Sequence, residues 1–439
     1  MHSVTRRDAL KAFGAAALSA GSGTTLEPRT SAAADLGYPS ESGAQLKVLR
    51  WKRFVQGDED VWLSNSRKFT EQTGVPVQVE SVNVEDLRPK GAMAASVGVG
   101  PDIMVGAPDM PQLYPDKCVD LTDLANHLGQ KYGGWYDVCR RYCTLDGRWV
   151  SLTIAVVPFC VVYRQSMVNA AGFRDIPRDL PGFLGLCQAL KARGTPAGLC
   201  LGNSSGDTNW CCWLLWSHGA SLVDENNRVT INSKQTIAAL DYARALYPTF
   251  APGTLAWLDP SNNKAFLSGE ISLTWNPISI YYVAKNSTES VLKAIAADIQ
   301  HARLPIGPVG RPTELHGLLA TWIFKYTKYP IAAREYLRFM LEREQFDAWE
   351  QASLGFMAGP LQAYESHPIW TSDPKITPFR DGPRTSLYRG YPGKVGHASA
   401  ACTSDFVIEN MVAEAASGQL TPQEAVAKAE LRARRYYKA

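Results

Sequence analysis

Residues 202–206 fit the pattern Gly-x-Ser-x-Gly, with Ser204 at its centre. An apolar stretch at residues 199–201 precedes the pattern and a predicted helix at residues 210–219 follows it, the setting in which hydrolases display a nucleophilic serine. Such a serine also needs a histidine as base, and no motif supports any downstream histidine: His218, His301, His316, His367 or His397. We therefore expect no catalytic residue, and a hydrolase using Ser204 stays open as an alternative, as do paired carboxylates for sugar cleavage.

Other patterns for chemistry are absent from the sequence. It contains no phosphate-binding glycine loop, dinucleotide fingerprint, HExxH helix or EF-hand loop. Three consecutive carboxylates, Asp58, Glu59 and Asp60, indicate a solvated loop rather than a metal site, and none of the nine cysteines has zinc-site spacing. We expect neither a metal nor a cofactor.

The aromatic residues favour binding of a carbohydrate. There are twelve tryptophans in 439 residues, and sugar C–H faces stack on indole rings while sugar hydroxyls bond to planar polar side chains. Trp275 and Asn276 end an apolar run just before Pro277, so we select this pair as candidate ligand contacts. Trp213 and Trp216, three residues apart in a predicted helix, are expected to pack in the core.

The elements that would position these residues alternate between strand and helix. Residues 45–51 alternate as a strand, a polar loop covers residues 56–60, and a helix follows through Phe69 and stops at Gly74. Residues 75–82 and 100–105 read as further strands, so the order predicts a right-handed βαβ unit. The fold class is α/β with mostly parallel sheets.

Two later helices have clear start signals. Pro330 opens a predicted long helix that runs through Trp349. Thr421, Pro422 and Glu424 combine a capping box with proline at the first helical position.

Charge and the first residues indicate location. The formal charge is +3, and residues 1–34 hold four basic and two acidic side chains, so the remainder carries +1. A nearly neutral protein has no electrostatic reason to bind nucleic acid.

Arg6 and Arg7 precede a short apolar stretch and then Ala32-x-Ala34, a pattern that resembles a twin-arginine signal peptide removed on export. We expect a soluble periplasmic protein whose cysteines are mostly buried thiols, with their pairing undecided.

Short segments in a fixed order carry a family resemblance. They are residues 68–77 (KFTEQTGVPV), 100–103 (GPDI), 147–149 (GRW), 163–165 (YRQ), 170–173 (AAGF), 265–270 (AFLSGE), 304–308 (LPIGP), 323–328 (IFKYTK) and 416–425 (ASGQLTPQEA). With this order and spacing, the chain resembles the extracellular solute-binding proteins of ABC importers, in the carbohydrate-binding group that includes maltose-binding protein.

The resemblance implies two α/β lobes with a ligand cleft between them. Lobe 1 would comprise residues 45–154 and 303–357, and lobe 2 residues 157–298 and 360–439. The chain would cross between lobes near residues 152–157, 299–305 and 355–360. The protein would then be a monomer that closes around a sugar or polyol and delivers it to a membrane permease.

Candidate ligand contacts follow from the same resemblance. Together with Trp275 and Asn276 they are Gln56, Asp58, Asp109, Asp207, Asn209, Arg389 and Tyr391. Two departures from the family pattern, Val156-Val157-Pro158 on the first crossing and Ile278-Ser279 where a tryptophan is common, indicate a smaller or less polar ligand than a maltodextrin. A non-sugar solute such as a polyamine or an organic anion remains a further alternative.

Overall fold

The computed structural model of the chain describes residues 41–204 and 206–438. The predicted export signal, residues 1–34, lies outside the described residues. All described residues belong to one compact unit. Among them, no helix is long and apolar enough to cross a bilayer.

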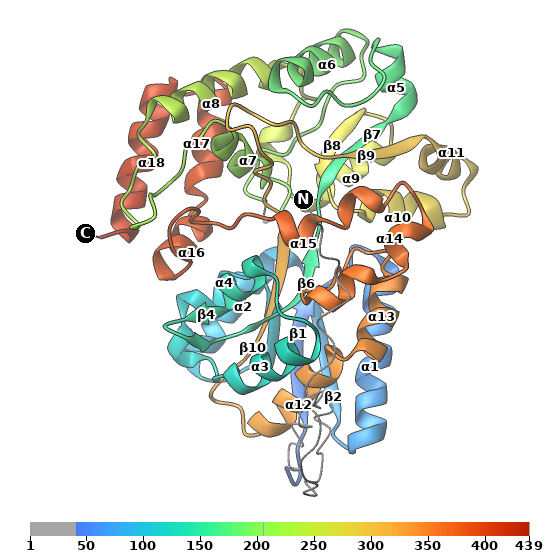
Figure 1. Ribbon diagram of the computed structural model, residues 1–439, viewed down its shortest axis with the longest axis vertical. Helices are drawn as coiled ribbons and strands as arrows, with labels where there is room; N and C mark the ends of the chain where they lie inside the picture. Colours follow the sequence, from blue (N-terminus) through green and yellow to red (C-terminus); the bar gives the residue numbers. More distant parts are fainter. Residues whose placement is uncertain (1–40, 205, 439) are drawn as a thin grey trace, which may run out of the picture. The chain divides into compact units, whose positions relative to one another are not determined.

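A five-stranded mixed sheet has the strand order β2-β1-β3-β10-β6 (Figure 1). Its strands are β1 (Leu46–Trp51), β2 (Val77–Val82), β3 (Ile103–Gly106), β6 (Leu152–Val157) and β10 (Gly317–Ile323). The β1 strand pairs in parallel with both β2 and β3, in register Val48↔Val79 and Val48↔Ile103, which confirms the predicted βαβ order. The helices packed around it are α1 (Gln56–Thr73), α2 (Val84–Val97), α3 (Thr122–Lys131), α4 (Asp137–Cys143), α12 (Pro330–Met340) and α13 (Arg343–Ala352).

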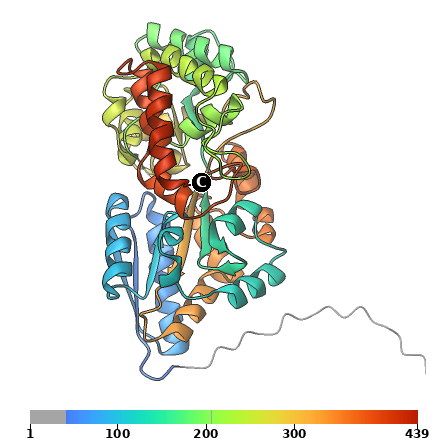
Figure 2. The same ribbon diagram turned by 90° about the vertical axis from the view of Figure 1, so that its left-hand side faces the viewer.

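A three-stranded sheet has the order β8-β7-β9. Its strands are β7 (Cys160–Arg164), β8 (Leu273–Asn276) and β9 (Ile299–Ala302), and the surrounding helices are α5 (Gln165–Ala170), α6 (Leu180–Ala192), α7 (Trp210–Ser217), α8 (Lys234–Leu246), α9 (Asp259–Leu267), α10 (Ser279–Asn286) and α11 (Ser290–Asp298). The C-terminal helices α17 (Val407–Ala416) and α18 (Pro422–Tyr436) pack against α8, far from them in sequence (Figure 2).

Short elements complete the described chain. They are β4 (Thr144–Leu145), β5 (Arg148–Trp149), α14 (Ile369–Ser372), α15 (Gly382–Thr385), α16 (His397–Ser404) and the 3-10 turns η1 (Met110–Leu113), η2 (Pro115–Lys117), η3 (Tyr247–Thr249), η4 (Thr254–Ala256), η5 (Gln362–Ser366) and η6 (Thr377–Phe379).

The prediction of mostly parallel sheets is wrong for the later strands, although the α/β class is confirmed. The β10 strand pairs antiparallel with β3 and β6, and β7 pairs antiparallel with β8 and β9. The physical reason lies in the path of the chain. It leaves the first sheet along β6 and enters the second along β7, then returns along β9 and β10, so outgoing and returning strands run in opposite directions. The boundaries of the two lobes stay a prediction.

Local signals set several helix ends correctly. Gly74 has φ 73° at the end of α1, a left-handed conformation that costs glycine little. At the start of α18, Thr421 Oγ1 accepts from the Glu424 N–H at 3.2 Å and Glu424 Oε2 accepts from the Thr421 N–H at 2.8 Å. These contacts are the predicted capping box.

Two other local predictions are wrong. The expected loop at residues 56–60 is the first turn of α1, where the carboxylates of Asp58 and Glu59 favour the helix N-terminus. The long helix expected from Pro330 through Trp349 is broken between α12 and α13. Tyr364 Oη donates to the Leu341 carbonyl at 2.6 Å, and the Glu342 side chain binds Lys131, Tyr132 and Arg338, so tertiary contacts stabilise the break.

Candidate functional site

A cavity of about 150 Å³ opens where both sheets end. Trp51, Gly106 and Val157, which line it, are the last residues of β1, β3 and β6, and Gly317 is the first residue of the antiparallel β10. Asn276, at the end of β8, brings in the second sheet. Open α/β sheets commonly bind ligands outside the carboxyl ends of their strands. Five aromatic residues of the described chain belong to its wall: Trp51, Phe54, Tyr142, Phe159 and Phe356.

Asp109 offers an acceptor to the cavity. It lies three residues after the end of β3, caps the start of η1, and is 4% exposed. Arg88 of α2 donates from Nη2 to Asp109 Oδ1 at 2.8 Å and from Nη1 to Ser404 Oγ at 2.9 Å. The other carboxylate oxygen, Asp109 Oδ2, is buried and accepts no hydrogen bond from the described residues. This oxygen is available to a bound donor.

Asp207 is the second buried carboxyl group in the cavity wall. It is 4% exposed, and its Oδ2 has no hydrogen-bond partner among the described residues. Burial raises the pKa of Asp207 well above its usual value, the negative charge of Asp259 raises it further, and a hydrogen bond with Asn262 acts in the opposite direction. Asp259 also lines the cavity.

Arg389 connects three elements beside the cavity. It donates from Nη2 to Asn209 Oδ1 at 2.8 Å and from Nη1 to Glu409 Oε1 at 2.5 Å, while its backbone N–H donates to Tyr142 Oη at 2.8 Å. Burial alone would lower the pKa of Arg389, but the Glu409 carboxylate holds it above its usual value. Arg389 therefore stays charged and holds the Asn209 amide in one orientation.

His316 supplies a donor that sequence reasoning did not select. Its Nδ1 accepts from the Phe159 N–H at 3.0 Å, and burial lowers its pKa to about 3. The ring is therefore neutral with its proton on Nε2. That nitrogen is buried without a hydrogen-bond partner among the described residues, in a side chain that lines the cavity. In the sequence His316 stood out only as one of several histidines after Ser204.

The structure brings five of the nine predicted contacts to the cavity wall: Asp109, Asp207, Asn209, Asn276 and Arg389. Asn276 lies there with its amide already used, since Nδ2 donates to the Pro277 carbonyl at 2.8 Å and to Ser279 Oγ at 3.0 Å, and Oδ1 accepts from Asn262 at 3.1 Å.

The other four predicted contacts do not line the cavity. Gln56 is exposed and donates to Asp60 Oδ1 at 2.7 Å, and Asp58 forms a fully buried ion pair with Arg50 at 2.5 Å. Trp275 is 1% exposed and lies behind the wall, with its ring 5.6 Å from Phe159 and 6.1 Å from His316. Tyr391 packs edge-on against Trp216 and accepts from Arg311 Nη2 at 2.7 Å.

Ser204 has a structural contact. Its Oγ accepts from the Asp207 N–H at 3.2 Å, and the side chain is 2% exposed. Within residues 41–204 and 206–438, no histidine is hydrogen-bonded to this hydroxyl, so the base that a nucleophilic serine needs is not in contact with it.

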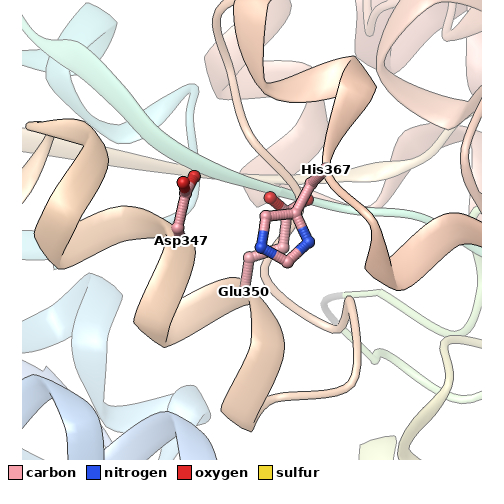
Figure 3. A group of neighbouring side chains, drawn as sticks. All are labelled: Asp347, Glu350 and His367. Atoms are coloured by element: carbon pink, nitrogen blue, oxygen red, sulfur yellow. The ribbon is translucent and has the colours of Figure 1, made fainter. Parts of the chain in front are cut away.

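A second group of titratable side chains lies outside the cavity wall. Figure 3 shows Asp347 and Glu350 on α13 with His367, which follows η5, and the potential ligand atoms of these three residues lie within 4.8 Å of one another. His367 Nδ1 accepts from the Ile369 N–H at 3.1 Å, which puts the proton of the neutral ring on Nε2. Asp347 accepts from Arg343 at 3.1 Å. A metal bound at Nε2 would move the ring proton to Nδ1, which could then no longer accept from the Ile369 N–H. We therefore assign no metal to this group.

Glu350 in this group predicts a dependence of stability on pH. Burial raises its pKa well above the usual value, against smaller opposite effects of the Gly359 amide and the Trp370 indole. The pKa of Glu350 is higher in the folded than in the unfolded protein. Its contribution to the free energy of unfolding is therefore fully present below about pH 4.5 and is lost as pH rises through the raised pKa. We expect Glu350→Gln to match the parent near pH 4 and to be more stable at pH 8, by about 1.4 kcal/mol per pKa unit of elevation.

Urea unfolding at both pH values checks this expectation. Glu344→Gln, an exposed residue on the same helix, is the matched control and should show no such difference. Equal stability of Glu350→Gln and the parent at pH 8 would show that the carboxylate is compensated in the folded protein.

Three comparisons with known proteins bear on this site. The chain is 22% identical over 205 residues to a probable ABC transporter-binding protein of Deinococcus radiodurans, an alignment covering 45% of this chain and 48% of that protein. The chain thus spans about half the length of the curated relative that it matches.

Solved structures resemble the fold over most of both chains. The GacH receptor of Streptomyces glaucescens GLA.O, solved unliganded and with acarbose and an acarbose homolog, has a TM-score of 0.74 at 17% identity, covering 90% of this chain and 99% of that chain. Maltose-bound MalE3 of T. maritima has a TM-score of 0.76 at 18% identity, covering 89% and 99%. An ABC transporter solute-binding protein of Thermotoga lettingae TMO bound with α-D-tagatose has a TM-score of 0.76 at 16% identity, covering 90% of this chain and 100% of that chain. At these identities the likeness establishes the two-lobe α/β fold.

The family follows from the sequence itself. The sequence model described as "Bacterial extracellular solute-binding protein" matches residues 66–378, more than half of the chain. This chain therefore belongs to the bacterial extracellular solute-binding proteins.

Proposed function

We propose that this protein is the substrate-binding component of an ABC importer and that it holds a sugar or related polyol in the cavity. The observation that carries the proposal is the composition of the wall, in which aromatic rings stand beside unpartnered buried polar atoms. Asp109 Oδ2 and Asp207 Oδ2 would accept from hydroxyl groups and His316 Nε2 would donate to one. Trp51 or Phe356 would stack on a sugar face.

Binding without chemistry is sufficient for this role. A neutral hydrogen bond contributes about 0.5–1.5 kcal/mol and one to a charged group more. A handful of such bonds with one stacked ring reaches about −8 kcal/mol, which corresponds to micromolar affinity. Such an affinity allows both capture of a scarce solute and its release to a membrane permease.

The ligands of the structurally similar proteins support a carbohydrate ligand here. Those proteins were solved with acarbose, maltose and α-D-tagatose, and the curated relative is named as a probable ABC transporter-binding protein. Because these relatives are ABC transporter binding proteins, we also propose that this protein delivers its solute to a membrane permease.

The lobes and their movement are also part of the proposal. Lobe 1 would comprise residues 45–154 and 303–357 and lobe 2 residues 157–298 and 360–439, a division supported by the separate sheets. Contacts such as Arg88 with Ser404 would link these lobes across the cavity. Solute that binds better when the lobes are closed would shift the population toward that state.

Membership of an extracellular family implies that the protein works in the periplasm or outside the cell. We propose that the twin-arginine-like residues 1–34 direct its export and are removed, and that the mature protein is a monomer.

Calorimetric titration of residues 35–439, freed of copurified solute, against sugars, sugar alcohols, polyamines and organic anions tests the function. We expect one-to-one micromolar binding of a sugar or polyol that is recovered intact from the mixture. Tight binding of a non-hydroxylated solute alone would overturn the carbohydrate assignment.

Product analysis of the same mixtures tests the hydrolase alternative. We expect Ser204→Ala to leave every ligand as intact as the parent protein does, since no histidine of the described chain is hydrogen-bonded to the Ser204 hydroxyl. Conversion of a ligand that disappears in this variant would make the protein an enzyme.

A further inference from the structure

The charges in the cavity wall are compensated unequally. Asp109 forms an ion pair with Arg88 at 2.8 Å, and Arg389 forms one with Glu409 at 2.5 Å. These two pairs cancel within the protein. Asp207 forms no ion pair with any cation in the described chain, although it is only 4% exposed.

The groups that face Asp207 do not supply a positive charge. The carboxyl group of Asp259 and the amide of Asn262, both on α9, interact with it, and the Cys200 thiol lies near enough to do so as well. Asp207 meanwhile lines the cavity, and its Oδ2 has no hydrogen-bond partner among the described residues. The cavity thus contains a buried carboxyl group with a free oxygen and a second carboxyl nearby.

Burial of an ionised carboxylate without a counter-charge is costly, so such a group either takes up a proton or is paired. The raised pKa of Asp207 indicates that the carboxyl group is protonated in the free protein. A ligand that places a positive charge next to Oδ2 would instead pair with the ionised carboxylate.

We propose that the solute is a sugar or polyol that carries a protonated amino group, and that Asp207 is the residue that receives this ammonium. The inference rests on the proposed function, because it concerns the same cavity. The ammonium donates to Asp207 Oδ2, while hydroxyl groups of the same solute bond to Asp109 Oδ2 and His316 Nε2. The aromatic rings in the wall add cation–π attraction.

Matched pairs of ligands test this inference. We would titrate the mature protein at pH 7 with glucose and glucosamine, galactose and galactosamine, sugars aminated at other ring positions with their parents, and putrescine as an amine without hydroxyls. We expect at least one amino sugar to bind about ten- to one-hundredfold more tightly than its parent, the gain of a charge-assisted hydrogen bond.

Asp207→Asn should abolish that difference, because the amide fills the same site without a negative charge. Asp109→Asn is the comparison variant, and it should weaken both members of a pair alike.

The unaltered protein provides an independent measurement. Because Asp207 must lose its proton to pair with the ammonium, affinity for the amino sugar should rise with pH as long as the amine of the free solute stays protonated, whereas affinity for the parent sugar should stay flat. Titrations in phosphate and in Tris, which differ in ionisation enthalpy, should report proton release for the amino sugar alone.

The outcomes separate the two proposals. Parent sugars that bind as tightly as every amino counterpart would overturn the amine inference and leave the sugar-binding function standing. Binding of putrescine without binding of any sugar, or of no ligand in the panel, would overturn both.

Discussion

Replacement of Asp58 by alanine is expected to destabilise the protein by about 3–5 kcal/mol, the cost of removing one partner from a buried ion pair. Arg50 and Asp58 are both fully buried, with Arg50 Nη2 2.5 Å from Asp58 Oδ2. Trp349 Nε1 also donates to Asp58 Oδ1 at 3.0 Å, and the guanidinium lies 4.4 Å from the Trp51 ring and 4.8 Å from the Trp62 ring. The alanine variant leaves this buried guanidinium without a counter-charge.

Urea unfolding followed by circular dichroism measures the effect. The double variant Arg50→Met with Asp58→Leu is the control, because an apolar pair of similar volume should recover much of the stability. A loss below about 1 kcal/mol in Asp58→Ala would contradict the buried pair. Solute affinity of the folded fraction should be unchanged, since Asp58 does not line the cavity.

Replacement of Asp109 by alanine is expected to weaken solute binding about ten- to one-hundredfold, the range for loss of a hydrogen bond to a charged group. The stability of the protein should fall by only about 1 kcal/mol or less. Arg88 has a 24% exposed side chain and keeps its 2.9 Å contact with Ser404, so water and this hydroxyl can satisfy the freed guanidinium.

Calorimetry with the solute identified by the titrations, together with thermal unfolding, separates the two effects. Asp109→Asn should fall between the parent and Asp109→Ala, because its amide oxygen still accepts while the charge is gone. Asp116→Ala, an exposed carboxylate a few residues along the chain, should bind like the parent. An unchanged Kd in Asp109→Ala would remove Asp109 from the binding site.

Among the site residues, those on turns that leave a strand or enter a helix could be found from the sequence. Asp109 follows β3, and Asp207 and Asn209 precede α7. All three line the cavity. Their position along the chain, read together with the family resemblance, was enough to select them.

Residues inside regular elements could not be judged in this way. Gln56 and Asp58 were expected in a loop, but the chain is helical from Gln56, and Asp58 turns toward Arg50 while Gln56 faces solvent. Trp275 was expected at a polar turn and instead lies behind the Phe159 and His316 side chains. Which side of an element faces a cavity depends on the elements packed against it.

The sequence by itself determined the α/β class, the β1-α1-β2 order, the end of α1 at Gly74 and the capped start of α18. These features depend on hydrophobic alternation and on contacts within a few residues, which one stretch of chain contains in full. It also determined the family, through short segments in a fixed order.

Only the tertiary structure decided the antiparallel pairing of β6 with β10, the break between α12 and α13, and the cavity that joins Asp109, Asp207 and His316. Each of these depends on residues far apart along the chain. The lowered pKa of His316 and the raised pKa of Asp207 both result from burial by distant segments. Those segments also bring no cation of the described chain to Asp207. Burial and pairing arise when distant segments exclude water together, and no single segment carries that information.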